Sequence, residues 1–308
     1  MTERYRRRPP HGHADRNLSA AMAAVAAGLV ISACGAAAPS PAGPATSART
    51  NVASSPQPSS RQPSDRPAAS ASASASASRG TTDGGQKAKL LAGKVVGIDP
   101  GHNGLNSTDP SYLAQQVWNG RALEDCDTTG TESNGGYTEA LFNFNVATYL
   151  SADLRREGAR VVMTRTSNHG VGPCVDRRAQ ILDRAHADVA IDIHADGGPS
   201  SGRGFTVLEP VADGPNDKVI AASVQFGSDV RSAFLTRTPM PVSNYYGHDG
   251  LIFRTDLAGL NLTTVPKVLI ETGNMRNATD AALLTSASGQ RRIARALEAA
   301  INHFLTGR

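Results

Sequence analysis

Three short runs of β-branched and other apolar residues each end on a histidine or a glutamate, and this feature constrains the fold most. The runs are residues 95–102, 189–194 and 268–271, which end at His102, His194 and Glu271. Each run has the composition of a buried strand. In open α/β sheets, ligands collect at the carboxyl ends of the strands. Two imidazoles and a carboxylate at that edge predict a hydrolytic metal site.

Strands and helices alternate over the C-terminal two thirds of the chain. The strand candidates are 94–98, 159–165, 188–193, 204–208 and 266–271, and the helix candidates are about 138–157, 174–187, 216–236 and 279–305. Gly158 is placed to end the first of these helices, and Asn216 and Thr279 are reasonable N-caps for the last two. This order predicts an α/β sandwich with a largely parallel sheet. Residues 93–308 are enough for one sizeable domain.

Residues 1–33 are typical of a signal peptide. Five arginines precede a short apolar stretch from Leu18 to Ala33, which is shorter than the roughly 18–20 residues that span a bilayer. The stretch ends at Ser32-Ala33-Cys34-Gly35, which resembles the bacterial lipobox, in which the cysteine is acylated and becomes the first residue of the mature chain. The alternative is secretory cleavage beside an incidental cysteine. We therefore expect an exported protein, anchored through Cys34 to the outer face of the bacterial cytoplasmic membrane, or secreted to the cell wall if Cys34 is not lipidated.

Residues 34–92 carry this cysteine and a segment rich in Ala, Ser and Pro, with almost no large apolar residue. Such a composition cannot bury enough surface to offset its ordering entropy, so we predict a disordered linker. The basic balance of the chain also belongs to the leader and linker. Residues 93–308 carry 20 basic and 23 acidic side chains, which leaves the domain without the electrostatic footprint of a nucleic-acid binder.

Cys126 and Cys174 remain once Cys34 is assigned to lipid. Two cysteines in an exported domain are most simply a disulfide. The alternative role is metal binding, but the two cysteines lie 48 positions apart with no CxxC pairing. A disulfide would tie the long segment 104–136 to the rest of the domain, and loops of this length are commonly functional and often border a cleft.

A catalytic zinc ion typically takes three protein ligands and keeps a water molecule in the fourth position. His102 and His194 are the first two candidates. Glu139 opens the helix predicted over 138–157 and is the best placed carboxylate. The three residues are scattered along the chain, so their spacing alone does not decide the matter.

Several other polar residues near the strand ends have two open interpretations. Asp99 either accepts a hydrogen bond from a ligand imidazole or caps the turn at Pro100. Asp192 and Asp196 flank His194 and either accept such a hydrogen bond or are ordinary polar residues at the sheet edge; Asp192 shares the strand face of His194. Arg254 and Asp256 either line a peptide groove, where the arginine pairs with a substrate carboxylate, or form a surface salt bridge. Glu271 itself has the alternative of an ion pair with a nearby arginine such as Arg276.

Four motifs occur in a fixed order along 93–308. They are Asp99-Pro100-Gly101-His102-Asn103-Gly104, Gly136-Tyr137-Thr138-Glu139 followed by Asn143, Ile193-His194-Ala195-Asp196, and Ile270-Glu271-Thr272-Gly273-Asn274. This set resembles that of the zinc-dependent N-acetylmuramoyl-L-alanine amidases, the type-3 amidase family. The resemblance implies a three-layer α/β sandwich around a mixed sheet of six strands. Asn103, Asp196, the cysteine pair and the long segment 104–136 depart from the common family pattern.

The resemblance also implies a site and a reaction. One zinc ion would be held by His102, Glu139 and His194, and Glu271 would be the catalytic glutamate. The expected reaction is cleavage of the amide between N-acetylmuramic acid and L-alanine in peptidoglycan, by a monomer whose partners are peptidoglycan or muropeptides and the membrane. The alternatives are a zinc peptidase that cuts within the stem peptide, and a non-catalytic lipoprotein that binds the cell wall.

Overall fold

The computed structural model describes residues 89–308. The predicted signal peptide, Cys34 and nearly all of the predicted linker lie outside the described residues. Leu91 is already fully buried in the core. Within residues 89–308, no helix combines the length and the apolar composition needed to cross a bilayer.

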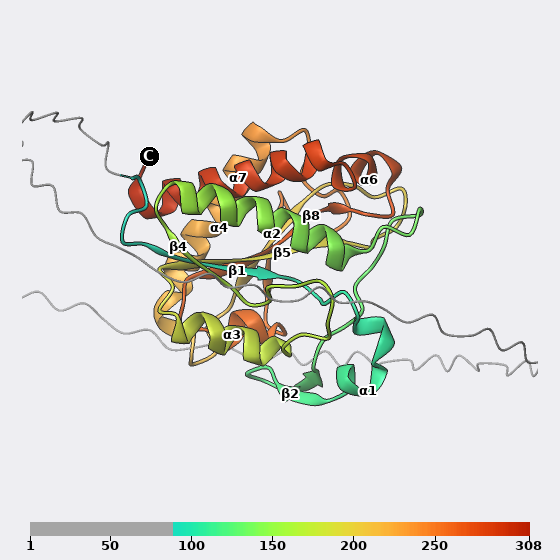
Figure 1. Cartoon of the computed structure of the whole chain (residues 1–308), viewed down its shortest axis with the longest axis horizontal. Helices are drawn as coiled ribbons and strands as arrows, with labels where there is room; N and C mark the ends of the chain where they lie inside the picture. The colour runs from blue at the N-terminus through green and yellow to red at the C-terminus, as the bar shows by residue number, and fades with distance from the viewer. Residues whose placement is uncertain (1–88) are drawn as a thin grey trace, which may run out of the picture. The chain divides into compact units, whose positions relative to one another are not determined.

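A mixed sheet of six strands forms the centre of the fold (Figure 1). The strand order is β4-β1-β5-β8-β6-β7. The strands are β1 (Val95–Pro100), β4 (Arg160–Met163), β5 (Val189–Asp196), β6 (Thr206–Pro210), β7 (Leu251–Arg254) and β8 (Lys267–Asn274). Strands β4, β1, β5 and β8 are parallel, whereas β6 runs antiparallel to β8 and carries β7 in parallel. The predicted fold class and all five predicted strands are confirmed. Strand β7 was not predicted, because it is short and only partly buried.

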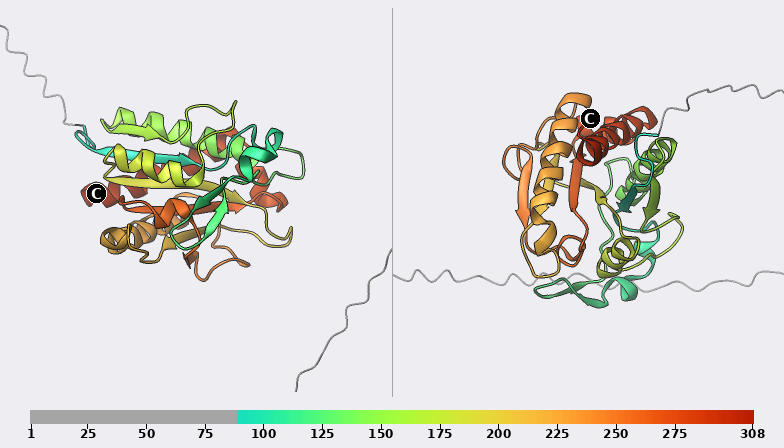
Figure 2. Two further views of the ribbon diagram at one scale, coloured as in Figure 1. Left: turned by 90° about the horizontal axis from the view of Figure 1, so that it is seen from below. Right: turned by 90° about the vertical axis from the view of Figure 1, so that its left-hand side faces the viewer.

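Helices cover both faces of the sheet (Figures 1 and 2). On one face lie α2 (Glu139–Arg156), α4 (Ile220–Arg237) and α7 (Ala287–Thr306), and on the other lie α3 (Val175–Arg184) and α5 (Ala258–Asn261). Helix α6 (Ala278–Leu284) precedes α7, and the 3-10 turn η2 (Asp217–Val219) precedes α4. The segment between β1 and α2 contains η1 (Asn106–Thr108), α1 (Pro110–Leu113) and a hairpin of β2 (Gln116–Trp118) and β3 (Leu123–Asp125). This segment therefore contains short secondary-structure elements of its own.

Two details of the helix prediction are wrong. The single helix expected over 279–305 is two helices, because Asn277 caps α6 and Ser286 caps α7 with side-chain hydrogen bonds, whereas Thr279 is the residue after the first position of α6. Asn216 does not cap α4, which begins at Ile220. Its buried side chain instead donates hydrogen bonds to Val211 O and Leu260 O. Gly158 ends α2 as expected, with a φ of 101° that favours glycine.

The alternation of side chains along the central strands separates an apolar face from a polar one. Val96 and Ile98 of β1, Ile191 and Ile193 of β5, and Val268 and Ile270 of β8 belong to the main hydrophobic core, which includes residues of α2, α4 and α7. The intervening positions face α3 and α5 and carry Asp99, Asp192, His194, Lys267 and Glu271. The chemistry of the domain is therefore concentrated on one face of the three central strands.

Four charged residues on this polar face form a buried series of ion pairs, which we call the central ion-pair chain: Asp192, Lys267, Asp99 and Arg178. Lys267 Nζ lies 3.2 Å from Asp192 Oδ2 and 2.6 Å from Asp99 Oδ2. Arg178 of α3 lies 2.9 Å from Asp99 Oδ1 through Nη1. Burial alone would raise the pKa of Asp99, but the charges of Lys267 and Arg178 hold that pKa well below its usual range.

Replacing Lys267 with methionine leaves two buried carboxylates short of a cation, and we expect it to destabilise the domain by about 3–5 kcal/mol. Urea denaturation at neutral pH with a chelator present measures this free energy without a contribution from bound metal. Lys94→Met is the matched control, since the Lys94–Asp188 pair is partly exposed, with a separation of 3.8 Å, and such pairs contribute less than about 1 kcal/mol. If both variants lose a similarly small free energy of unfolding, the central ion-pair chain does not support the fold.

Candidate metal centre and active site

The polar face brings four of the predicted site residues to one edge of the sheet. His102 follows β1, His194 lies in β5, and Glu271 is its direct neighbour in β8. Glu139 is the first residue of α2. His102, Glu139 and His194 each offer one possible ligand atom, and these atoms lie within 4.8 Å of one another. The three parallel strands end together, which is why residues so distant in sequence meet here.

Glu139 lies between the two imidazoles. Its Oε2 lies 3.2 Å from His102 Nε2 and its Oε1 lies 2.8 Å from His194 Nδ1. The same carboxylate accepts hydrogen bonds from Thr131 N at 2.9 Å, Ala195 N at 3.2 Å and Asn143 Nδ2 at 3.3 Å. Asn143, one turn along α2, was part of the second motif. These bonds fix the carboxylate with one oxygen toward each ring.

The opposite nitrogen of each imidazole faces another acceptor. His102 Nδ1 lies 3.2 Å from Asp127 Oδ1 and 3.1 Å from Thr128 O. His194 Nε2 lies 3.3 Å from Asp192 Oδ1, at ion-pair distance but without a well-aligned hydrogen bond, so Asp192 faces a candidate ligand imidazole. Metal-bound histidines usually have such a partner, which fixes the tautomer and the ring orientation. Sequence reasoning missed Asp127, although it directly follows Cys126.

The electrostatics of the cluster favour a positive charge between the rings. Burial alone would lower the pKa of His102, but Glu139 and Asp127 raise it to about 9. Burial likewise opposes the charged form of His194, yet the nearby carboxylates of Asp192 and Glu139 raise its pKa well above the usual value. A donor set of two imidazole nitrogens and one carboxylate matches that of catalytic metal sites. The residues therefore fit a bound divalent metal ion.

Two glycines allow the rings and the carboxylate to approach closely. A Cβ on Gly101 would lie 2.2 Å from the imidazole of His194. A Cβ on Gly130, whose φ is 72°, would lie 2.7 Å from His102 Cδ2 and 2.8 Å from Glu139 Oε2. His102 itself has a φ of 56°, which is uncommon for a residue other than glycine. Its carbonyl accepts a hydrogen bond from Arg178 Nη2 at 2.9 Å, which helps to hold this backbone conformation.

Glu271 lies beside this cluster with one carboxylate oxygen free. Its Oε2 is buried and has no hydrogen-bond partner among residues 89–308. Burial, together with the charges of Glu139 and Asp196, raises the pKa of Glu271 to about 8. Arg276, the alternative partner, donates to Glu132 O instead. The carboxyl group of Glu271 is therefore available to a molecule that enters the site.

Arg254 and Asp256 pair with each other. Arg254 Nε lies 2.6 Å from Asp256 Oδ1, and its Nη2 lies 2.6 Å from Asp256 Oδ2. The guanidinium also donates to the hydroxyl of Tyr246. The salt bridge between these two residues is therefore present, and the guanidinium of Arg254 remains partly exposed.

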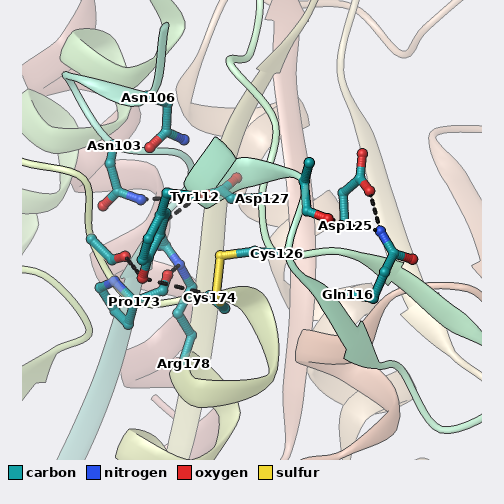
Figure 3. Close-up of a disulfide and its surroundings, with 12 residues drawn as sticks. Asn103, Asn106, Tyr112, Gln116, Asp125, Cys126, Asp127, Pro173, Cys174 and Arg178 are labelled. Carbon is teal, nitrogen blue, oxygen red and sulfur yellow. Dashed lines mark hydrogen bonds and ion pairs between the residues drawn. A yellow bond between two sulfur atoms is a disulfide. The ribbon is translucent and has the colours of Figure 1, made fainter. Parts of the chain in front are cut away.

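The predicted disulfide is present. Cys126 and Cys174 are bonded and lie beside Asp127 and Arg178 (Figure 3). A cavity of about 190 Å³ adjoins both imidazoles, under the β2–β3 hairpin and the start of α5. The disulfide therefore borders the metal centre from the side of the long segment between β1 and α2.

The sequence profile of the N-acetylmuramoyl-L-alanine amidase family matches residues 96–303. The chain belongs to this family. It is 41% identical to the N-acetylmuramoyl-L-alanine amidase Rv3717 of Mycobacterium tuberculosis, over 70% of this chain and 88% of that protein. Its structure resembles that of the N-acetylmuramyl-L-alanine amidase Ami1 of Mycobacterium smegmatis, with a TM-score of 0.67 and 38% identity over 71% of this chain and 99% of the other. The apo form of Ami1 from Mycobacterium abscessus is similar, with a TM-score of 0.66 and 39% identity over 70% of this chain and 100% of the other.

Gly101→Ala tests the close approach of this glycine to His194. We expect the added methyl group to displace the imidazole and to weaken divalent metal binding about tenfold or more, measured by competition with a chromophoric chelator. Gly170→Ala is the matched control, because a Cβ there meets no atom within 4 Å. An unchanged affinity in the Gly101 variant would contradict this view of the site.

Proposed function

We propose that this amidase hydrolyses the bond between N-acetylmuramic acid and L-alanine in peptidoglycan, with one zinc ion per domain. The observation that carries the proposal is the cluster of His102, Glu139 and His194 with the unpaired carboxylate of Glu271 on the adjacent strand. Membership of the amidase family supports the choice of substrate.

Zinc would be held by His102, Glu139 and His194. When bound, a zinc ion polarises the scissile carbonyl and makes a water molecule more acidic. Glu139 and the two imidazoles hold their positions through the hydrogen bonds described above, so the ligand atoms need little rearrangement. The excess of negative charge around the two rings favours the entry of a cation.

Glu271 moves the proton. Its free Oε2 accepts the proton of the attacking water and then delivers it to the nitrogen of L-alanine as the amide bond breaks. Because this oxygen has no hydrogen bond to give up within the described part of the chain, a water molecule is its natural partner. Burial raises the pKa of Glu271 to about 8, close to neutrality, where a group acts well as both base and acid.

Arg254 and Asp256 are proposed substrate contacts. The paired guanidinium of Arg254 is still partly exposed, and it retains N–H groups that suit a carboxylate of the stem peptide.

The proposed location follows from the N-terminal sequence. We propose that residues 1–33 direct export, that Cys34 carries a lipid, and that the following Ala/Ser/Pro-rich linker lets a monomeric catalytic domain reach the wall above the membrane. Secretion into the wall is the outcome if Cys34 is not acylated.

Glu271→Gln tests the proton-transfer role. We expect turnover to fall on the order of 10²–10⁴-fold, while zinc content stays at one ion per protein. Glu209→Gln is the matched control: Glu209 is another buried glutamate whose pKa burial raises to about 7, but it packs against Gly227 of α4 on the opposite face. Normal turnover in the Glu271 variant would refute the mechanism.

The products identify the bond that is cut. Mass spectrometry of digested muropeptides should find stem peptides that begin with free L-alanine, and a chelator should abolish them. Fragments that keep L-alanine on the muramyl group would instead favour a peptidase, and no digestion would favour a wall-binding protein.

Cys34→Ala tests the anchor. We expect the variant to move from the membrane fraction to the culture medium or the wall, as followed by immunoblotting of fractions. Because residue 34 precedes the catalytic domain, its muropeptide activity should stay unchanged. Continued membrane retention would count against lipidation.

A further inference from the structure

The acceptors behind the two imidazoles are connected to each other through the protein interior. Asp127, behind His102, lies 3.3 Å from Arg178 Nη2 through its Oδ2. Arg178 is one end of the central ion-pair chain, and the other end, Asp192, lies behind His194. The two rings are therefore joined on one side by Glu139 and on the other by a continuous series of buried charges of alternating sign.

Asp127 is the only member of this series, among the described residues, that comes from the long segment between β1 and α2. Its carboxylate is almost fully engaged. Oδ1 faces His102 Nδ1 and accepts a hydrogen bond from Thr128 N at 2.7 Å. Oδ2 accepts from Asn103 Nδ2 at 3.0 Å and from Arg178 Nη2. The carbonyl and hydroxyl oxygens of Thr128 also lie near His102 Nδ1. Because Asp127 accepts from Thr128 N, it positions the backbone of Thr128 as well as its own carboxylate behind this ring.

The disulfide fixes the backbone that carries Asp127. Cys126 directly precedes Asp127, and Cys174 directly precedes α3, the helix of Arg178 (Figure 3). A backbone hydrogen bond of 2.9 Å from Val175 N to Cys126 O joins the same two segments. The covalent bond thus holds Asp127 and its partner Arg178 at a set distance, although they belong to separate parts of the chain.

We propose that Asp127 is a positioning residue for the metal centre, and that the Cys126–Cys174 disulfide maintains its position, so that metal affinity depends on oxidation of this cysteine pair. An acceptor at His102 Nδ1 keeps the proton on that nitrogen. It thereby leaves Nε2, which faces Glu139, unprotonated and able to bind a metal ion. The inference rests on the proposed metal ligands, and it does not depend on which bond of the substrate is cut.

The first test measures zinc binding by the full chain, with a chromophoric chelator as competitor. Asp127→Ala should weaken zinc binding about 10–100-fold. Asp127→Asn should show a smaller loss, because the amide oxygen still accepts from His102 Nδ1. Asp125→Asn is the matched control, since Asp125 is exposed and its carboxylate bonds to Gln116; its affinity should not change.

Cobalt in place of zinc gives a second readout, because the visible absorption of bound Co²⁺ reports the geometry of its ligands. We expect an altered spectrum for Asp127→Ala and a normal one for Asp125→Asn. If Asp127→Ala lowers the urea midpoint of the metal-free protein while the zinc affinity and the cobalt spectrum stay normal, Asp127 has only a structural role and the proposal fails.

The role of the disulfide is tested by a double-mutant cycle. The variant Cys126→Ser/Cys174→Ser should lose zinc affinity by a factor similar to that of Asp127→Ala. The combined variant should lose little more, because both changes release the same contact. If the fold loss of zinc affinity in the combined variant equals the product of the two separate fold losses, the disulfide acts independently of Asp127 and the proposed coupling is overturned.

Reduction of the folded wild-type protein gives the same comparison if the serine variant does not fold. Zinc affinity should fall on reduction of wild type and change little on reduction of Asp127→Ala. An unchanged affinity in reduced wild type would overturn the proposed dependence on oxidation. If zinc binding follows this pattern but the protein does not cleave muropeptides, the result contradicts the proposed function and leaves the role of Asp127 and the disulfide unaffected.

Discussion

The ion pair between Lys267 and Asp99, buried beneath the central strands, is the interaction on which the rest of the polar face depends. Lys267 is fully buried on β8, and Asp99 is buried on β1, with β5 between them. A lysine without a partner would not remain charged in such a place. The pair therefore requires the strands to adopt the register in which Asp99, Asp192 and Lys267 meet, and this register also aligns His194 with Glu271.

Buried ion pairs are weak evidence for stability, because well-packed apolar residues often serve as well. The central ion-pair chain matters because of the residues that its two ends contact. One end, Asp192, lies behind the imidazole of His194. The other end, Arg178, pairs with Asp127, which lies behind the imidazole of His102. Glu139 contacts both rings from the front. Charges that cost free energy to bury thus hold two rings in the orientation that a metal ion needs. The apolar face, packed against α2, α4 and α7, contributes the hydrophobic burial that offsets this cost.

Much of the fold was predictable because its signals are local. Runs of β-branched residues marked the strands, and the alternation of strands and helices indicated an α/β sandwich. The failures were local as well. Asn216 has the chemistry of an N-cap, yet its side chain joins the loop after β6 to α5. The helix predicted over 279–305 overlooks Ser286, whose side chain accepts from Gly289 N and caps a second helix. Strand β7 carries too little buried surface to be recognised.

The sequence by itself determined which residues bring chemistry to the sheet edge, since a strand delivers its last side chains to a place set by the parallel arrangement. Together with the four ordered motifs, it also indicated the family. Only the tertiary structure decided what faces the back of each imidazole. Asp127 comes from an irregular segment, and its position depends on a disulfide, on Arg178 and on the backbone of Thr128. Such contacts between distant residues have no periodicity, so no pattern along the chain predicts them.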